Sequence, residues 1–361
     1  MTSDNIRGLM KFLPEGFASA SRETKAMQRT GKGIKDPSDL MWLMLTHLSQ
    51  GQSLANMSAL CTASGVGRLS NVSVMNRLAG CGGWFKWVLA RLAPAGVADY
   101  LKPKGLSGYR ILAVDASDVK SGMSKFSATW HLHYALDVFT LTSHEMKLTE
   151  SAVGETLTHF TAAKGDLFLG DRIYGSKKGI SHCLNNEADF ILRLHHDAFA
   201  MRRETGERLD LLKPLAPLKP GETADIPVYA DLSAYGLGTR KLRVCAVRKS
   251  DADIEKTMKR IDARDAKCER TASEDARRFN AYVAVITSLP PDVSADEVLG
   301  AYRYRWQVEL FFKRLKSLLG AGEVPKKRTD SMKAWLNGKM ILALLYEILL
   351  SKRDFSPLGR T

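Results

Sequence analysis

The order of strand-like and helix-like segments in the middle of the chain constrains its fold most. A short apolar run, Arg110–Asp115, ends in a carboxylate, and two more strand-like runs follow at hairpin spacing. After a helix-like stretch over Glu155–Ala163, a second apolar run, Asp166–Asp171, again ends in an acid. A helix over Lys178–Asn185 and a strand over Asp189–Leu194 complete the series. This order predicts an α/β domain in which antiparallel strands precede alternating helices and strands.

The same element order resembles the ribonuclease-H-like fold, which we expect for the catalytic core. The segment after this core is interrupted by Gly and Pro between alternating runs and is too long for a loop, which indicates an inserted β-rich unit. The predicted parts are a helical DNA-binding region (1–105), the first part of the core (106–195), a mainly β insertion (196–290), the helix that completes the core (291–322), and a basic C-terminal helical tail (323–361).

Basic residues are concentrated at the two ends of the chain. The whole sequence has 53 Lys and Arg against 39 Asp and Glu, for a net charge of +14. Residues 1–108 carry +7 and residues 301–361 carry +8, whereas the middle carries −1. A near-neutral centre between two basic ends indicates a polyanionic partner, and DNA is the leading candidate. The turn and serine cap at Ala63–Ser73 have the layout of a helix-turn-helix.

The stretch Ala301–Leu319 contains neither Gly nor Pro and predicts one long helix, preceded by a cap at Ser294 or Asp296. At 100° per residue, one face within an arc of about 60° presents a phenol, a guanidinium, a carboxylate and an amine. These are Tyr302, Arg305, Glu309 and Lys316. An ordinary solvated face with an i,i+4 ion pair is the alternative. The interleaved aromatic residues and the two strand-end aspartates favour a functional face.

Three carboxylates on separate elements are suited to phosphoryl transfer. The two-metal mechanism needs acids that converge on cations about 4 Å apart. Mg²⁺ prefers oxygen ligands and keeps several waters, so three acids suffice. An aspartate at the end of a buried strand is held rigidly, and a glutamate on a facing helix can reach it. Asp115, Asp171 and Glu309 meet this description.

The spacing Tyr302-x2-Arg305-x3-Glu309-x6-Lys316 matches the Y-R-E-K signature of the IS4 family of insertion-sequence transposases, which includes the Tn5 transposase. Asp115 resembles the first acid of that family. Asp171 resembles the second, which usually lies in Asp-Arg-Gly-Tyr; here Ile173 replaces the glycine. The resemblance spans about residues 105–320.

The resemblance implies a cut-and-paste DNA transposase. Such an enzyme binds its terminal inverted repeats, cleaves the ends and joins 3′-hydroxyls to target DNA, as a homodimer on paired ends. It also implies two Mg²⁺ (or Mn²⁺) ions held by Asp115, Asp171 and Glu309. The residues expected to contact the DNA end are Tyr302, Arg305 and Lys316, with Arg172 or Trp306 assisting. A flipped base would stack on an aromatic side chain, for which Trp130 and Trp306 both stay open.

Other polar residues are weaker candidates. Asp118 is an alternative to Asp115 as a ligand, and Asp137, at the end of a strand, is less favoured. His131 and His133 alternate on a strand without a partner spaced to complete a metal site, which favours a structural role. The remaining candidates are His195–His196, whose position at a strand end indicates a loop, and Lys326–Arg328, for which we expect a DNA-backbone clamp, with a solvated turn as the alternative.

Two other functions remain open at this point. A metal-dependent nuclease without strand transfer would use the same acids, whereas a non-catalytic, transposase-derived DNA-binding protein would have no need of them. The five scattered cysteines indicate reduced thiols, and no signal peptide is apparent. The apolar run Met340–Leu350 is too short for a membrane span. We therefore expect a cytoplasmic bacterial protein that is nucleoid-associated when bound to DNA, with no membrane partner.

Overall fold

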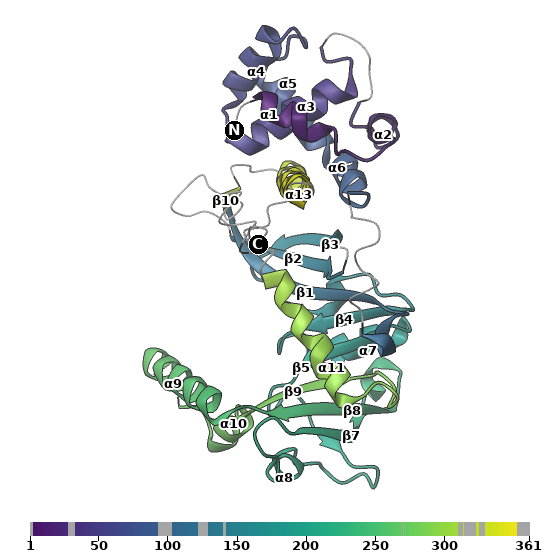
Figure 1. Ribbon diagram of the computed structural model, residues 1–361, viewed down its shortest axis with the longest axis vertical. Helices are drawn as coiled ribbons and strands as arrows, with labels where there is room; N and C mark the ends of the chain where they lie inside the picture. The colour runs from purple at the N-terminus through teal and green to yellow at the C-terminus, as the bar shows by residue number, and fades with distance from the viewer. Residues whose placement is uncertain are drawn as a thin grey trace, which may run out of the picture.

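A computed structural model describes the protein over residues 3–27, 33–92, 103–121, 129–139, 142–269, 271–309, 313, 323–324 and 329–351. It has a mixed α/β fold with one large sheet, and a group of helices lies beyond one end of that sheet (Figure 1). No helix of the described residues is long and apolar enough to cross a membrane.

The N-terminal region is helical, as predicted. Side-chain caps begin three of its helices: Asp36, Ser53 and Ser70 each accept a hydrogen bond from a backbone N–H of the first turn. The turn between the last two of these helices has the expected helix-turn-helix layout. The helices are α1 (Ser3–Met10), α2 (Phe17–Glu23), α3 (Pro37–Gln50), α4 (Leu54–Ala63), α5 (Asn71–Gly80) and α6 (Gly82–Leu89).

The C-terminal helix α13 (Thr329–Ser351) packs against the N-terminal helices α1, α3, α5 and α6. It lies between these helices and the sheet (Figure 1). Gly338 permits the close approach, because a Cβ at this position would lie 2.1 Å from Leu48 Cδ1 and 3.0 Å from Phe85 Cε2. The predicted apolar helix near the C-terminus therefore completes a bundle formed mainly by the first ninety residues.

The sheet order is β3-β2-β1-β4-β5-β9-β8-β7-β6, with the short β10 paired to β1. β1, β2 and β3 are antiparallel neighbours, and β4 and β5 continue from β1 in parallel. This is the predicted arrangement of three antiparallel strands followed by parallel ones. The strands are β1 (Arg110–Ser121), β2 (Thr129–Asp137), β3 (Thr142–Glu150), β4 (Asp166–Gly170), β5 (Asp189–Arg193), β6 (Met201–Arg202), β7 (Thr223–Asp231), β8 (Thr239–Arg248), β9 (Tyr282–Thr287) and β10 (Glu323–Val324).

The region expected to form an insertion (196–290) extends this same sheet, because β9 pairs with β5 and carries β8 and β7 beyond it. The region also contains helices: α8 (Leu212–Leu215), the 3-10 turn η4 (Ser233–Tyr235), α9 (Asp251–Cys268) and α10 (Glu274–Phe279). α9 projects away from the sheet (Figure 1), and only Ile261 of its side chains is buried. α7 (Lys177–Asn185) connects β4 to β5.

Alternate residues of the central strands enter two separate cores, as the pleat of a strand requires. Ile111 and Ala113 of β1 pack with Leu167 and Leu169 of β4 in one core, which also contains Val298 of α11 (Ala295–Tyr302). The intervening residues of both strands enter the core on the opposite face. α11 thus covers the face of the sheet to which the odd-numbered residues of β1 and β4 belong.

Three local predictions were wrong. The segment 155–163 forms only the 3-10 turn η3 (Leu157–His159) rather than a helix; β-branched threonines at 156, 158 and 161 disfavour one. β1 continues to Ser121, so Asp115 lies within the strand, because pairing with β2 extends past it. The predicted cap at Ser294 is confirmed, but the helix it begins is not continuous: it tightens into the 3-10 turn η5 (Arg303–Arg305) before helical geometry resumes at Trp306–Glu309.

We predict that Gly338→Ala destabilises the protein, because the added methyl group must displace Leu48 and the ring of Phe85. Overpacking of this kind costs about 1–3 kcal/mol. Urea unfolding measures this loss as a lower free energy of unfolding. The matched control is Gly8→Ala in α1, where no atom lies within 4 Å of an added Cβ, and it should be neutral or stabilising by up to about 1 kcal/mol. Equal effects of the two substitutions would contradict the packing of α13.

Candidate active site

The register of β1 and β4 brings Asp115 and Asp171 side by side. Ala113 pairs with Leu169 in this parallel ladder, so the two acids each lie two residues beyond a paired position. Neighbouring strands are about 4.8 Å apart. The alternation of the strands places Asp115 on the face covered by α11. β4 ends at Gly170, and Asp171 therefore begins the loop at the carboxyl end of the strand.

The helix that carries Glu309 meets the same strands. The turn η5, just before it, packs against both β1 and β4. Ser294 begins α11 with a full capping box, in which its hydroxyl and backbone N–H are paired with Glu297. Val308, next to Glu309, is fully buried in the core that contains Ala113 and Leu169. Glu309 thus follows a turn that packs on both strands, on the side of the sheet that α11 covers.

Arg305 joins the predicted DNA-contacting side chains to the acids. Its Nη2 donates to Glu309 Oε1 at 2.5 Å, and its guanidinium lies 5.7 Å from the centroid of the Tyr302 ring. The positive charge of Arg305 also interacts with Asp115. Three predicted residues thus lie together, while Lys316, the fourth, is outside the described residues.

Burial is the main influence on the charge of Asp115. Burial raises the pKa of Asp115 to about 6; the Ala116 N–H, 2.9 Å from Oδ1, opposes this, and the charges of Asp171 and Glu155 raise the pKa further. Asp171 accepts a hydrogen bond from the Ile173 N–H at 2.9 Å. The carboxylates therefore stand close enough to destabilise one another, and Arg305 offsets only part of the repulsion.

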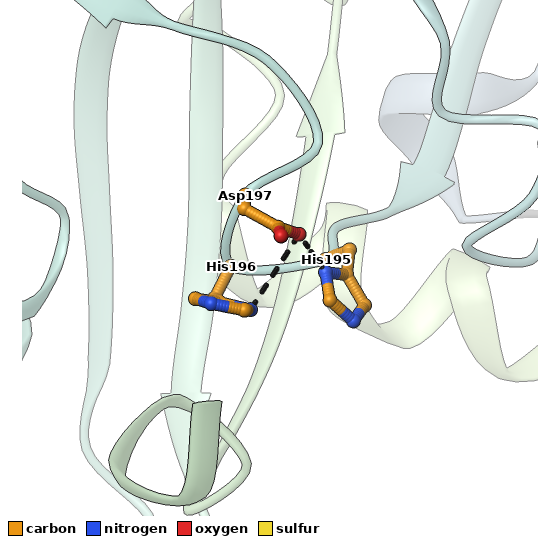
Figure 2. A group of neighbouring side chains, drawn as sticks. All are labelled: His195, His196 and Asp197. Carbon is orange, nitrogen blue, oxygen red and sulfur yellow. Dashed lines mark hydrogen bonds and ion pairs between the residues drawn. The ribbon is translucent and has the colours of Figure 1, made fainter. Parts of the chain in front are cut away.

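The three acids do not converge on a single point. Among the described residues, only His195, His196 and Asp197 place three metal-ligand atoms within 4.8 Å of one another. This group lies on the exposed turn after β5, where both imidazoles face the Asp197 carboxylate (Figure 2); the His196 Nδ1–Asp197 Oδ1 distance is 3.6 Å. A wider separation of Asp115, Asp171 and Glu309 is compatible with two ions about 4 Å apart.

A group of cationic side chains lies beside the acids. Arg172 donates to Asn280 Oδ1 at 2.9 Å, Arg193 to the Tyr282 carbonyl at 3.1 Å, and Lys249 to the Asn280 carbonyl at 2.7 Å. Burial lowers the pKa of Arg193 to about 10 and that of Lys249 to about 8, and mutual repulsion among the cations adds to both effects. These hydrogen bonds of the three cations go to neutral oxygens rather than to carboxylates. Because their positive charge is not matched by these partners, the group is suited to binding an anion.

The alternative residues have other surroundings. Asp118 is three residues after Asp115 and therefore on the opposite face of β1, with 62% of its side chain exposed; it pairs with His131 Nε2 at 2.7 Å. His133 is fully buried, and its Nε2 is 2.8 Å from Thr149 Oγ1. Asp137 caps its turn by accepting from the Phe139 N–H. Residues Lys326–Arg328 lie outside the described part of the chain.

The two tryptophans that could stack a base differ in exposure. Trp306, three residues before Glu309, is 56% exposed, whereas Trp130 is partly buried against the core. Sequence reasoning missed three other residues at the site: Glu155, Arg193 and Lys249. The only sequence signal for Arg193 is its position at the end of an apolar strand. Glu155 begins the stretch predicted as a helix, and Lys249 lies in a segment without a regular pattern.

Comparison with known proteins agrees with this geometry. Residues 106–345 match the family model of the transposase DDE domain, and the chain therefore belongs to this family of polynucleotidyl transferases. More particularly, it is similar to proteins of bacterial insertion sequences. It is 30% identical over 351 residues to InsL of the insertion sequence element IS186A of Escherichia coli K12, covering 95% of this chain and 93% of that protein.

Two further relatives support the assignment. The transposase for insertion sequence element IS421 of Escherichia coli is 30% identical over 352 residues, again covering 95% of this chain and 93% of that protein. The transposase for insertion sequence element IS231F of Bacillus thuringiensis subsp. israelensis is 27% identical over 141 residues, 38% of this chain and 28% of that one. The chain is a DDE transposase of insertion sequence type, and the Y-R-E-K match stays a prediction.

We predict that Asp115→Asn stabilises the metal-free protein at neutral pH. Because the pKa of Asp115 is raised on folding, its contribution to stability is complete below the pKa of the unfolded chain and is lost as the pH rises through about 6. Removing the charge should raise the free energy of unfolding at pH 7.5 by about 3 kcal/mol. Thermal unfolding in EDTA tests this; the gain should vanish near pH 4, and a loss of stability at pH 7.5 would contradict it.

Proposed function

We propose that this transposase cuts its insertion sequence out of DNA and joins the 3′-hydroxyls to target DNA through a site formed by Asp115, Asp171 and Glu309. The observation that carries the proposal is the parallel register that aligns Asp115 with Asp171 next to the Glu309 helix. We assign strands β1–β5 to a ribonuclease-H-like core on the basis of their order, and β6–β9 to its insertion.

The chemistry of these residues fits divalent cations. Members of the family use such ions, and the donors here are carboxylate oxygens, which hard ions such as Mg²⁺ or Mn²⁺ prefer. Burial, and to a smaller extent the charges of Asp171 and Glu155, raise the pKa of Asp115, and a bound cation would favour its ionised form. We infer that Asp115, Asp171 and Glu309 hold two ions. When bound, these would activate the attacking hydroxyl and stabilise charge on the leaving oxygen.

The protein's own groups position the DNA. Arg305 is held between Tyr302 and Glu309, so its guanidinium is oriented for a phosphate close to the acids. Arg172, Arg193 and Lys249 line the neighbouring surface with positive charge and would fix the strand in register. Trp306, with more than half of its side chain exposed, is placed for stacking on an extruded base.

The N-terminal helices are proposed to bind the terminal repeats. This region carries much of the net positive charge, and α4 and α5 form a helix-turn-helix. Val72, near the start of α5, is 60% exposed and is flanked by exposed Asn71. Amide and apolar side chains at this place in a second helix can read base edges in the major groove. Synapsis of two ends further implies a homodimer on DNA.

We predict that Glu309→Gln abolishes end cleavage and joining while leaving DNA binding intact. Loss of one member of an interdependent catalytic set should lower the rate about 10³-fold or more. The assay uses the terminal repeats that flank the gene, a target plasmid and Mg²⁺. Glu255→Gln on exposed α9 is the matched control. Unchanged cleavage by a folded Glu309→Gln protein would refute the mechanism, and cleavage without joining by the natural protein would favour a nuclease.

We predict that Arg172→Gln weakens binding of all DNA ends alike, because a phosphate contact carries no base information. The slope of log affinity against log salt concentration should fall by about one. Filter binding over a range of salt concentrations measures the slope. Arg240→Gln, at an exposed position of β8, is the control and should leave it unchanged. A loss restricted to particular sequences would contradict a backbone contact.

A further inference from the structure

Helix α9 carries its opposite charges on two separate sides. At 100° per residue, four of its five basic residues fall within an arc of about 80°, and four of its five acidic residues fall within an equal arc on the other side. The basic row consists of Lys256, Arg260, Arg264 and Lys267, and the acidic row of Asp251, Glu255, Asp262 and Asp265. Of the two remaining charged residues, Asp253 accepts a hydrogen bond from the capping residue Ser250, and Lys259 pairs with Glu255.

The acidic row is neutralised by cations from neighbouring elements. Arg277 of α10 donates to Asp262 at 2.7 Å and to Asp265 at 3.1 Å. Arg248, at the end of β8, pairs with Asp251 at 3.3 Å. The acidic row is therefore the side of α9 that faces α10 and the end of β8.

The basic row has no comparable partners on neighbouring elements of the described chain. Its ion pairs there stay within α9, from Lys256 to Asp253 at 3.7 Å and from Arg264 to Asp265 at 3.5 Å. All members of the row are exposed. Lys256, Arg260 and Arg264 are spaced four residues apart, a spacing at which like charges repel and destabilise a helix. The row is thus an exposed line of positive charge that is open to an anionic partner.

Hydrogen bonds join α9 to the cationic group beside the acids. Lys249 Nζ donates to Thr257 Oγ1 of α9 at 3.2 Å and to the Asn280 carbonyl at 2.7 Å. The side chain of the same asparagine accepts from Arg172 at 2.9 Å. The start of α9 is therefore fixed next to the cations that the proposed function assigns to the DNA strand.

The basic row leads away from this junction along α9. Relative to Thr257, Arg260 and Arg264 are rotated by only about 60° and 20° around the helix axis. At 1.5 Å per residue, Lys267 lies about 15 Å along the helix from Thr257. A strand of duplex DNA advances 3.4 Å per nucleotide, so the row can follow roughly four nucleotides. Because α9 projects away from the sheet, its length is accessible to a duplex (Figure 1).

We propose that the basic row of α9 is a DNA-binding surface that holds the phosphate backbone of the transposon end beyond the catalytic acids. Its charge is complementary to a polyanion, and its continuity with Lys249 and Arg172 indicates that the partner is the same DNA end. Arginine suits this role because its guanidinium can bind a phosphate through two hydrogen bonds. The inference rests on the proposed function, because it extends the surface that is assigned there to DNA.

Binding of the full-length protein to a duplex that carries the terminal repeat, measured over a range of salt concentrations, tests this surface. The double variant Arg260→Gln/Arg264→Gln removes two charges and keeps polar side chains. Each lost phosphate contact lowers the slope of log affinity against log salt concentration by about 0.9, so the slope should fall by about two. Arg260→Lys/Arg264→Lys retains both charges and should keep the slope; a lower slope in this variant would contradict a contact made through charge.

Arg240→Gln/Lys241→Gln is the matched control, because it removes the same amount of charge. Both residues are exposed and lie at the end of β8 that is remote from α9, since the strand runs to Arg248 just before the helix begins. This variant should keep the slope of the natural protein. Thermal unfolding checks the folding of the α9 variants; the glutamine variant should be no less stable than the natural protein, because it relieves repulsion between like charges.

The outcomes separate this inference from the function it rests on. If Arg172→Gln lowers the slope while the α9 glutamine variant behaves like the β8 control, the assignment to α9 is wrong and the proposed surface beside the acids stands. If neither changes the slope, both assignments are wrong. Capture of a target plasmid by the preassembled complex of protein and DNA end is measured in parallel. A loss confined to this capture would overturn the assignment to the DNA end and indicate target DNA instead.

Discussion

The proposed active site depends on the parallel pairing of β1 with β4. Through this register the chain sets Asp115 beside Asp171, and the two strands then diverge in length: β4 stops while β1 continues in pairing with β2. The described pairing leaves β1 without a strand neighbour on the side of β4 between Ala113 and Lys120. Arg305 belongs to the turn that packs on both strands, and it links the two elements because it donates to Glu309 and interacts with Asp115. Arg172, Arg193 and Lys249 add positive charge nearby.

The balance of charge explains why the site needs ligands. Burial raises the pKa of Asp115 and lowers those of Arg193 and Lys249, and neighbouring charges of the same sign add to each shift. The hydrogen bonds of Arg172, Arg193 and Lys249 go to the neutral oxygens of Asn280 and Tyr282 rather than to the acids. A metal ion would compensate the first group and a phosphate the second. Metal and DNA backbone are thus expected to meet at the same edge of the sheet.

Much of the fold could be predicted from periodicity. The order of strands from β1 to β5, the capped N-terminal helices and the apolar C-terminal helix are confirmed. Residues with a regular pattern around them, such as Asp171 after an apolar strand and Glu309 on a helix, could therefore be proposed as ligands. The 3-10 turn at Arg303–Arg305 could not be predicted from the sequence. It accompanies packing against β1 and β4, which the local sequence does not indicate. Glu155 and Lys249 acquire their surroundings only from tertiary contacts that bring distant segments together.

The central claim is that the metal ions bind at the aspartate pair and Glu309, rather than at the exposed His195–Asp197 turn where ligand atoms cluster most closely. Iron-mediated cleavage of the polypeptide tests it most directly. The protein is loaded with Fe²⁺ in place of Mg²⁺ and treated with ascorbate and peroxide, so that radicals cut the backbone near the bound ion. The account predicts fragments that end near residues 115, 171 and 309. Cleavage confined to residues around 195–197 would contradict it.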